Sequence, residues 1–329
     1  MKKELLLASF LTAGILLPSP ATAAVFSTIY SFGDSLSDNG NVNQAVLQAT
    51  GGTQTFPPSP PYDGGRFSNG LMWTELLAQQ LGIPLVNFAF GGATTGSANT
   101  LDNTLPGIPL PGLEQQINNF VFNTPVADPN ALYTIWVGAN DYLPTNSIGF
   151  TPVATPTIPL THIQEAVNSL VGIGAEQIMI LNLPNLGEVP RTSFSLDGNC
   201  PVNNQFDADC LNDVTIAHNN GLVSLFSGLP PEVNIIPVDI NSLVSDAIEN
   251  PAQFGLTNVT DGCFNQITFA VCSNPDEYLF WDSQHPSATG HQLIAQLAFQ
   301  SLGIPEPSAI AGLVAMGLMA VGTRVKGKR

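Results

Sequence analysis

A serine in a glycine-containing turn is the first candidate for chemistry in this sequence of 329 residues. Ser35 follows an apolar, β-branched run over residues 25–32 and stands beside Gly33 and Asp34. Such a run predicts a buried strand, and the abrupt change to small polar residues predicts a tight turn at its carboxyl end. Open α/β sheets bind their ligands at the carboxyl ends of their strands. The position therefore favours Ser35 as a nucleophile, although the same residue types also suit an ordinary turn.

A serine hydroxyl becomes a good nucleophile when a base removes its proton, and the base is usually a histidine oriented by a carboxylate. Of the four histidines, His285 is the best candidate. It lies three residues after Asp282 and directly before Pro286, which disfavours helical geometry at His285. An Asp-x-x-His loop can fold the carboxylate back onto the imidazole Nδ1, which leaves Nε2 facing outward. A helix N-cap beside an uninvolved histidine is the alternative for this spacing.

Acyl transfer also needs hydrogen-bond donors where negative charge develops on the substrate oxygen. The sequence offers the backbone amides of Ser35 and Gly92 and the side-chain amide of Asn140. Gly92 suits this role because a side chain there would crowd the substrate. A simple turn at Gly92 and a helix cap at Asn140 are the structural alternatives. Because the three residues follow three successive predicted strands, a parallel sheet would bring them to one edge.

The elements that must position these residues alternate along the chain. Short, nearly all-apolar strands are predicted at residues 25–32, 85–90, 131–137, 177–183 and 233–238. Amphipathic helices are predicted at residues 71–82, 113–122, 161–173, 212–226, 241–249 and 287–302. Apolar strands that alternate with helices indicate a parallel sheet covered on both faces, so we predict one α/β domain.

Four sequence blocks resemble those of the SGNH hydrolases, also called the GDSL lipase and esterase family. They are Gly33-Asp34-Ser35-Leu36, Asn87-Phe88-Ala89-Phe90-Gly91-Gly92-Ala93, Gly138-Ala139-Asn140-Asp141 and Asp282-Ser283-Gln284-His285-Pro286. The resemblance implies Ser35, Asp282 and His285 as the catalytic triad, with Ser35, Gly92 and Asn140 forming the oxyanion hole. It also implies a three-layer α/β/α sandwich around a flavodoxin-like parallel five-stranded sheet, and ester hydrolysis without a metal or cofactor. Residues 66–70 are similar to an early substrate-side segment of the lipase-like and phospholipase-like members.

The first 23 residues are typical of a secretory signal peptide. Lys2 and Lys3 precede an apolar run over residues 5–17, and Ala21-Thr22-Ala23 is a small-residue cleavage site. We therefore expect cleavage by signal peptidase and export of the remaining chain. An N-terminal membrane anchor is the alternative, and the shortness of the apolar run disfavours it.

The last 25 residues, 305–329, have the reverse layout. Pro305-Glu306-Pro307 precedes an apolar stretch over residues 309–322 and a basic tail. This order resembles the PEP-CTERM sorting signals of Gram-negative bacteria, which implies processing by an exosortase-type protease after transient membrane anchoring. A plain C-terminal anchor is the alternative. We expect a secreted protein, or one at the cell surface or outer envelope of a Gram-negative-type bacterium.

The domain between these ends, residues 24–304, is strongly acidic. It carries two basic residues, Arg66 and Arg191, against 23 acidic residues, which makes a formal charge of −21. Such a surface repels nucleic acid and anionic lipid head groups. The composition therefore excludes nucleic acid as a partner and suits a neutral or cationic small-molecule or lipid ester.

Four cysteines lie in two close pairs within loop-like sequence. In an exported chain an even number argues for disulfides, and short loops close most easily. We therefore predict Cys200–Cys210 and Cys263–Cys272. Zinc binding is the alternative, but the pairs lack metal-ligand spacing.

Three functions remain open from the sequence. The first is an exported serine esterase or lipase that forms an acyl-enzyme at Ser35. The second is a carbohydrate O-acetylesterase that acts on extracellular polysaccharide. The third is a surface or matrix protein on a hydrolase fold that has lost activity, which the complete set of candidate residues disfavours. The proline-rich loop over residues 53–62 and the proline- and threonine-rich loop over residues 144–159 are each either a lid or plain surface in these cases.

Overall fold

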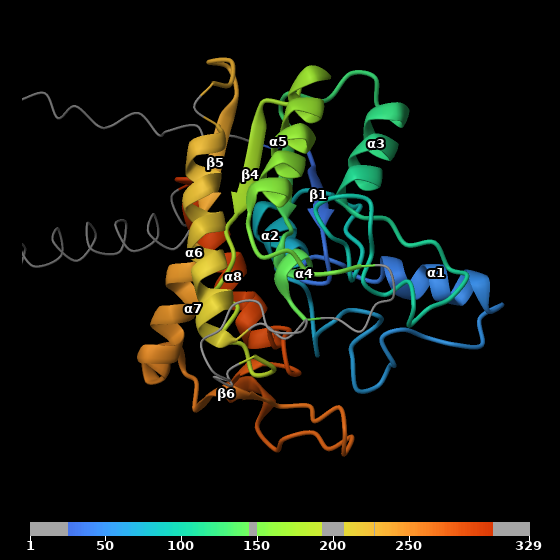
Figure 1. Ribbon diagram of the computed structural model, residues 1–329, viewed down its shortest axis with the longest axis vertical. Helices are drawn as coiled ribbons and strands as arrows, with labels where there is room; N and C mark the ends of the chain where they lie inside the picture. Colours follow the sequence, from blue (N-terminus) through green and yellow to red (C-terminus); the bar gives the residue numbers. More distant parts are fainter. Residues whose placement is uncertain (1–25, 145–149, 193–206, 227, 305–329) are drawn as a thin grey trace, which may run out of the picture.

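The computed structural model describes residues 26–144, 150–192, 207–226 and 228–304. Its centre is a parallel five-stranded sheet in the order β2-β1-β3-β4-β5. The strands are β1 Ile29–Gly33, β2 Leu85–Asn87, β3 Leu132–Trp136, β4 Gln177–Leu181 and β5 Asn234–Val238. All five point the same way, so their carboxyl ends lie along one edge of the sheet, at the lower side of Figure 1. This strand order is the flavodoxin-like order, as predicted.

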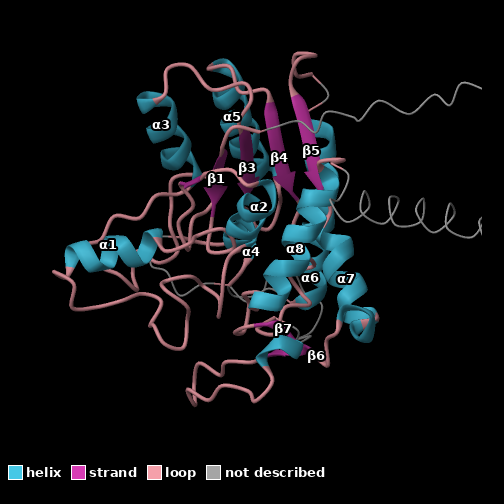
Figure 2. Ribbon diagram, turned by 180° about the vertical axis from the view of Figure 1, so that it is seen from behind, coloured by secondary structure: helices cyan, strands magenta, loops and turns pink. Residues whose placement is uncertain are grey.

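Helices cover both faces of the sheet, which gives three layers (Figures 1 and 2). The first layer contains α3 Leu113–Asn123, α5 Thr157–Gly172 and α6 Ala208–Leu225. The second contains α2 Trp73–Leu81, α7 Ile240–Glu249 and α8 Ala288–Ser301. The two short helices α1 Asn41–Ala49 and α4 Ala139–Tyr142 lie at the carboxyl-end edge, and short 3₁₀ turns occur at Pro251–Phe254 and Pro275–Glu277.

The side chains of the central strands alternate between two apolar cores. On β3, Leu132 and Trp136 pack with α2, α7 and α8, whereas Tyr133 and Ile135 pack with α3 and α5. Every residue of β3 is buried, because helices cover both of its faces. This burial explains why the strand sequence is a continuous apolar run rather than an alternation of apolar and polar residues.

The sequence predicted all five strands and the six larger helices, with differences at their ends. The second strand stops at Asn87 rather than residue 90, because the chain then turns into a glycine loop. The helices α1 and α4 were not predicted, because α4 has only four residues and α1, although as long as α2, begins directly after the polar turn that follows β1. No strand was predicted for β6 Asn258–Gly262 or β7 Tyr278–Phe280, which form a separate two-stranded sheet.

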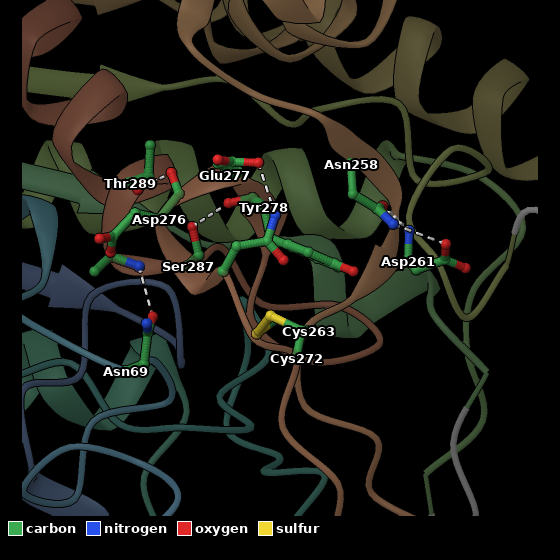
Figure 3. Close-up of a disulfide and its surroundings, with 12 residues drawn as sticks. Asn69, Asn258, Asp261, Cys263, Cys272, Asp276, Glu277, Tyr278, Ser287 and Thr289 are labelled. Carbon is green, nitrogen blue, oxygen red and sulfur yellow. Dashed lines mark hydrogen bonds between the residues drawn. A yellow bond between two sulfur atoms is a disulfide. The ribbon is translucent and has the colours of Figure 1, made fainter.

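The predicted disulfide between Cys263 and Cys272 is confirmed and closes a loop beside β7 (Figure 3). It excludes zinc binding by this pair, because both sulfur atoms are used in the covalent bond. Cys200 lies outside the described residues, so the pairing Cys200–Cys210 stays a prediction. The proposed signal peptide and the C-terminal sorting segment also lie outside the described residues. Within the described part of the chain, every helix is too short or too polar to cross a membrane.

Candidate active site

The turn after β1 presents Ser35 at the carboxyl-end edge of the sheet. Asp34 Oδ1 accepts a hydrogen bond from the Leu36 amide at 2.9 Å, which fixes the turn around the serine. Gly33 has a φ of 155°, and a Cβ there would lie 2.2 Å from the carbonyl oxygen of Trp136 on β3. A side chain at this position would therefore separate β1 from β3 just before the serine.

Ser35, His285 and Asp282 form a continuous chain of hydrogen bonds. The hydroxyl oxygen of Ser35 lies 2.9 Å from His285 Nε2, and His285 Nδ1 lies 2.7 Å from Asp282 Oδ2. The other carboxylate oxygen of Asp282 accepts from the backbone amides of Gln284 and His285 at 2.9 and 2.8 Å. These two amide bonds fold the Asp-x-x-His loop as its spacing predicts. In this arrangement a histidine can take the proton of a serine hydroxyl.

A fourth residue, Tyr62, belongs to this chain and was missed by the sequence reasoning. Its hydroxyl donates to Asp282 Oδ2 at 2.6 Å and accepts from Gln266 Nε2 at 3.0 Å. The ring is buried edge-on against Phe264 and Trp281. Tyr62 is the last residue of the proline-rich loop, so this end of the loop contacts the site instead of being plain surface. No local signal pointed to it, since its partner lies 220 residues away.

The surroundings of Asp282 keep this carboxylate ionised. Burial alone would raise its pKa, because a charged group is poorly solvated inside a protein. Attraction to His285 and hydrogen bonds from His285, Tyr62 and the Gln284 amide outweigh burial, so the pKa of Asp282 lies below its ordinary value. An ionised carboxylate at this position can orient the imidazole and stabilise its positive charge.

The side chain of Asn140 points to the same edge from helix α4. Its Nδ2 donates to the carbonyl of Ala93 at 3.0 Å, which uses one of its two N–H groups and leaves the other available. The next residue, Asp141, accepts from the amide and hydroxyl of Thr95 at 2.9 and 2.7 Å. These hydrogen bonds attach helix α4, which follows β3, to the glycine-containing loop that follows β2.

Gly92 is required by the fold itself, and the predicted crowding of the substrate stays a prediction. Its φ is 77°, and a Cβ there would lie 2.4 Å from Asn99 Oδ1 and 2.7 Å from Leu101 Cγ. A side chain would thus collide with the protein's own loop as well as adopt a disfavoured backbone conformation. Neither the Gly92 amide nor the Ser35 amide donates a hydrogen bond to another of the described residues. Both amides can therefore donate to an oxyanion, together with Asn140.

The segment at residues 66–70 supports the histidine side of the site. The ring of Phe67 lies 5.2 Å from the imidazole of His285. The hydroxyl of Ser68 donates to the carbonyl of Pro286 at 2.9 Å. Asn69 Oδ1 accepts from the first amide of α8 at 2.7 Å (Figure 3). The segment therefore holds the loop that carries His285 against the start of α8.

Two hollows have His285 in their linings. We call the first the apolar pocket: it is lined by Ser35, Asn140 and His285 and by aliphatic side chains that include Leu143, Leu186, Ile240, Val244, Leu293 and Ile294. We call the second the aromatic groove, which has a volume of about 320 Å³ and lies between the proline-rich loop and the disulfide loop. Gln284 and His285 are the lining residues that both hollows share.

The other three histidines are outside this chain of hydrogen bonds. His162 contacts the hydroxyl of Thr95, His218 that of Tyr142, and His291 Nδ1 accepts from the amide of Trp73. Burial lowers the pKa of His218 to about 4 and, with some repulsion from His285, that of His291 to about 3. These two histidines are therefore neutral packing residues at ordinary pH. Within the described residues, no group of three or more His, Cys, Asp or Glu side chains could hold a metal ion.

Three buried carboxyls make the stability of the fold depend on pH. Burial raises the pKa values of Asp34 and Asp141 to about 7 and that of Asp38 to about 6. In the unfolded chain an aspartate has a pKa of about 3.9, so between these values the folded protein binds protons that the unfolded chain does not. The stability that protonation contributes is therefore lost as the pH rises through about 7.

We expect the melting temperature to rise by several degrees when the pH is lowered from 8 to 6.5, measured by calorimetry. Asp34→Asn should flatten this dependence, because an amide resembles the protonated acid and Asp34 Oδ2 has no hydrogen-bond partner among the described residues. His218 and His291 oppose this gain increasingly as the pH approaches 6.5, because they are then protonated only in the unfolded chain, so the range stops there. A melting temperature that falls over this range would contradict the prediction.

Comparison with known proteins identifies the family. A sequence model described as GDSL-like Lipase/Acylhydrolase matches residues 29–298. A phosphatidylcholine-sterol acyltransferase of Aeromonas hydrophila is 26% identical over 318 residues, covering 83% of this chain and 89% of the relative. Acetylajmalan esterase 2 of Rauvolfia serpentina is 27% identical, covering 82% of this chain and 89% of the relative. A crystal structure of a GDSL-like lipase from Parabacteroides merdae aligns with a TM-score of 0.46 at 16% identity, over 85% of this chain and 96% of that one.

The chain belongs to the GDSL-like lipase and acylhydrolase family, whose matched segment spans most of the described domain. It is accordingly a carboxylic ester hydrolase.

Proposed function

We propose that the protein is an exported serine esterase or lipase that hydrolyses carboxylic esters through Ser35, His285 and Asp282. The observation that carries the proposal is the chain of contacts from Ser35 Oγ to His285 Nε2 at 2.9 Å and from His285 Nδ1 to Asp282 at 2.7 Å. Family membership supports it independently.

The mechanism has two halves that share these residues. His285 removes the proton of Ser35 as the hydroxyl attacks the ester carbonyl, and the negative charge that forms on the carbonyl oxygen is stabilised by the amides of Ser35 and Gly92 and by Asn140. His285 then donates its proton to the leaving alcohol, which leaves an acyl-enzyme at Ser35. In the second half, His285 activates a water molecule that releases the acid and restores the serine.

The apolar pocket beside Ser35 suits a short acyl group, because its volume is about 50 Å³. The apolar pocket beside the serine is lined mainly by aliphatic side chains of α7, α8 and the loop after β4, and burial of each methylene there contributes about 0.8 kcal/mol. The acidic character of the domain favours a neutral ester over an anionic one. The relative named as a phosphatidylcholine-sterol acyltransferase supports a lipid ester as the substrate class.

A series of p-nitrophenyl esters tests this function on the purified protein. We expect kcat/KM to rise from acetate to butyrate, because the added methylenes enter the apolar pocket, with about threefold per methylene as the upper bound for full burial. We expect no further rise at hexanoate, because the pocket has a volume of about 50 Å³. Activity confined to acetate would instead support the carbohydrate O-acetylesterase. If the protein hydrolysed none of the esters and was not labelled by a serine-reactive phosphonate, that result would support a non-catalytic surface or matrix role.

The cell location is also part of the proposal. Residues 1–23 would be removed by signal peptidase, and residues 305–329 would be processed by an exosortase-type protease, so that the mature enzyme works outside the cytoplasm or at the outer envelope. The disulfide between Cys263 and Cys272 supports an oxidising compartment, because such bonds are rare in the cytosol.

A further inference from the structure

The aromatic groove adjoins the proposed active site and has no role in the proposed steps of ester hydrolysis. It is lined by rings and prolines, among them Phe56, Pro58, Phe67, Phe264 and Phe269. Its volume of about 320 Å³ is within the range of small-molecule sites. The groove and the apolar pocket share Gln284 and His285 in their linings, so a bound ester could extend into both.

The two hollows differ in which reacting groups they contain. The apolar pocket is lined by Ser35 and Asn140 as well as His285, whereas the aromatic groove reaches only His285 among these three. The ester carbonyl must lie between the serine and the oxyanion donors, which places the acyl chain in the apolar pocket. His285 must protonate the oxygen of the leaving alcohol, so the alcohol lies on the histidine side. The aromatic groove is therefore in position to hold the alcohol part of the ester.

The polar groups of the groove are already paired with other protein groups. Gln266 donates to Tyr62 and accepts from Ser283 at 3.2 Å, Tyr62 donates to Asp282, and Gln284 accepts from Arg191. Few donors or acceptors therefore remain for the hydroxyl groups of a sugar. Neither Arg66 nor Arg191 lines the groove, so a phosphate on the alcohol would find no cation there. These features favour a neutral and apolar alcohol.

Phe269 at the rim of the groove occupies an unfavourable conformation. It is the one non-glycine residue of the described chain with a positive φ, at 59°, and 73% of its surface is exposed. An aromatic residue in this region is a true outlier, and strained residues of this kind gather at functional sites. The Phe269 ring lies 6.3 Å from that of Phe264.

The loop that carries Phe269 is held in place from within. The Asn265 carbonyl accepts from the Phe269 amide at 2.8 Å, the Asn265 side chain accepts from the amides of Ile267 and Thr268, and the disulfide closes the loop. The exposed ring of Phe269 is thus presented beside the groove by a fixed backbone. A ligand bound in the groove would contact this ring.

We infer that the aromatic groove is the alcohol-side subsite of the enzyme and that it binds an alcohol with a neutral, apolar ring. Flat rings fit such a lining because aromatic pairs gain offset-stacked or edge-to-face contacts beyond simple area burial. The inference rests on the proposed function and extends it, since it names the chemical class of the leaving group.

Esters with one acyl group and different alcohols test the inference on the purified protein. Benzyl butyrate and n-hexyl butyrate have apolar alcohols of similar size and acidity, and 6-O-butyrylglucose supplies a polar ring. We expect kcat/KM for benzyl butyrate to exceed that for n-hexyl butyrate by about three- to tenfold, and to exceed that for the glucose ester by more. Equal values for the benzyl and hexyl esters, or preference for the glucose ester, would overturn the inference.

Phe269→Gly supplies the matching variant. It removes the ring but suits the backbone, because glycine adopts a φ of 59° without strain, so the melting temperature should not fall. The ratio of benzyl to hexyl kcat/KM should decrease toward one, whereas Phe122→Ala, which removes an equally exposed ring on α3, should leave the ratio unchanged. An unchanged ratio in Phe269→Gly would overturn the subsite. If the unmodified protein hydrolysed none of these esters, the proposed function would be overturned, and the inference with it.

Discussion

Ser35→Ala is expected to lower kcat for p-nitrophenyl butyrate hydrolysis by about 10⁴-fold or more, measured by release of p-nitrophenol. The expected loss is this large because alanine has no oxygen with which to form the acyl-enzyme. The oxyanion donors at Gly92 and Asn140 would remain, and they can support only a small residual rate by water attack.

The fold should survive this replacement, so the loss can be assigned to chemistry. Ser35 lies in a turn, and its hydroxyl contact in the described structure is the one to His285. Ser31→Ala is the matched control: Ser31 is a buried serine on β1, the strand that leads into this turn, and its hydroxyl has no partner among the described residues. It should keep the full rate. Equal rates for Ser35→Ala and the unmodified protein would exclude Ser35 as the nucleophile.

Asp282→Asn is expected to lower kcat at pH 7 by about 10⁴-fold with little change in structure. The amide oxygen can keep the two backbone hydrogen bonds that Asp282 Oδ1 now accepts. The amide nitrogen would then face His285 Nδ1 and donate to it, which moves the imidazole proton to Nε2. A protonated Nε2 cannot accept the proton of Ser35, so the base is lost while the geometry remains.

Tyr62→Phe is a milder variant for comparison with Asp282→Asn, because it keeps the carboxylate of Asp282 and removes one of the hydrogen bonds to it. A hydrogen bond to a charged group contributes about 1.5 kcal/mol or more, so we expect kcat/KM to decrease by about tenfold. Loss of the Tyr62 hydrogen bond raises the pKa of Asp282 only from below its ordinary value, so this carboxylate stays ionised near neutral pH and the loss of kcat/KM should be the same at pH 7 and at pH 8. A structural role alone would lower the melting temperature and leave kcat/KM of the folded protein unchanged. If Asp282→Asn lowered kcat/KM no more than Tyr62→Phe does, the orienting role of Asp282 would be refuted.

Much of the fold and the core of the site could be predicted from the sequence because both depend on local patterns. Continuous apolar runs identify buried parallel strands, and the strand-end motifs place Ser35, Gly92 and Asn140 at one edge of any such sheet. The pair Asp282 and His285 is also local, since two backbone amides between them fold the carboxylate onto the imidazole. The close approach of His285 to Ser35 was inferred from chemistry and is found at 2.9 Å.

Other features depend on residues far apart in the chain and were settled only by the tertiary structure. Burial in the folded protein raises the pKa values of Asp34 and Asp141 to about 7. No sequence motif indicates this shift. One need for glycine at position 92 comes from Asn99 and Leu101, which lie against it in the folded chain. The small sheet of β6 and β7 is equally nonlocal, because its strands are short and are separated by the disulfide loop.

The sequence by itself determined the type of fold, the family and the residues of the proposed triad and oxyanion hole, because each is specified by short runs with strong local preferences. The tertiary structure alone decided what surrounds them. Tyr62 reaches Asp282 across 220 residues, and the aromatic groove forms where the proline-rich loop meets the disulfide loop. Such contacts depend on how distant segments pack together, and packing between distant segments has no signature within either segment.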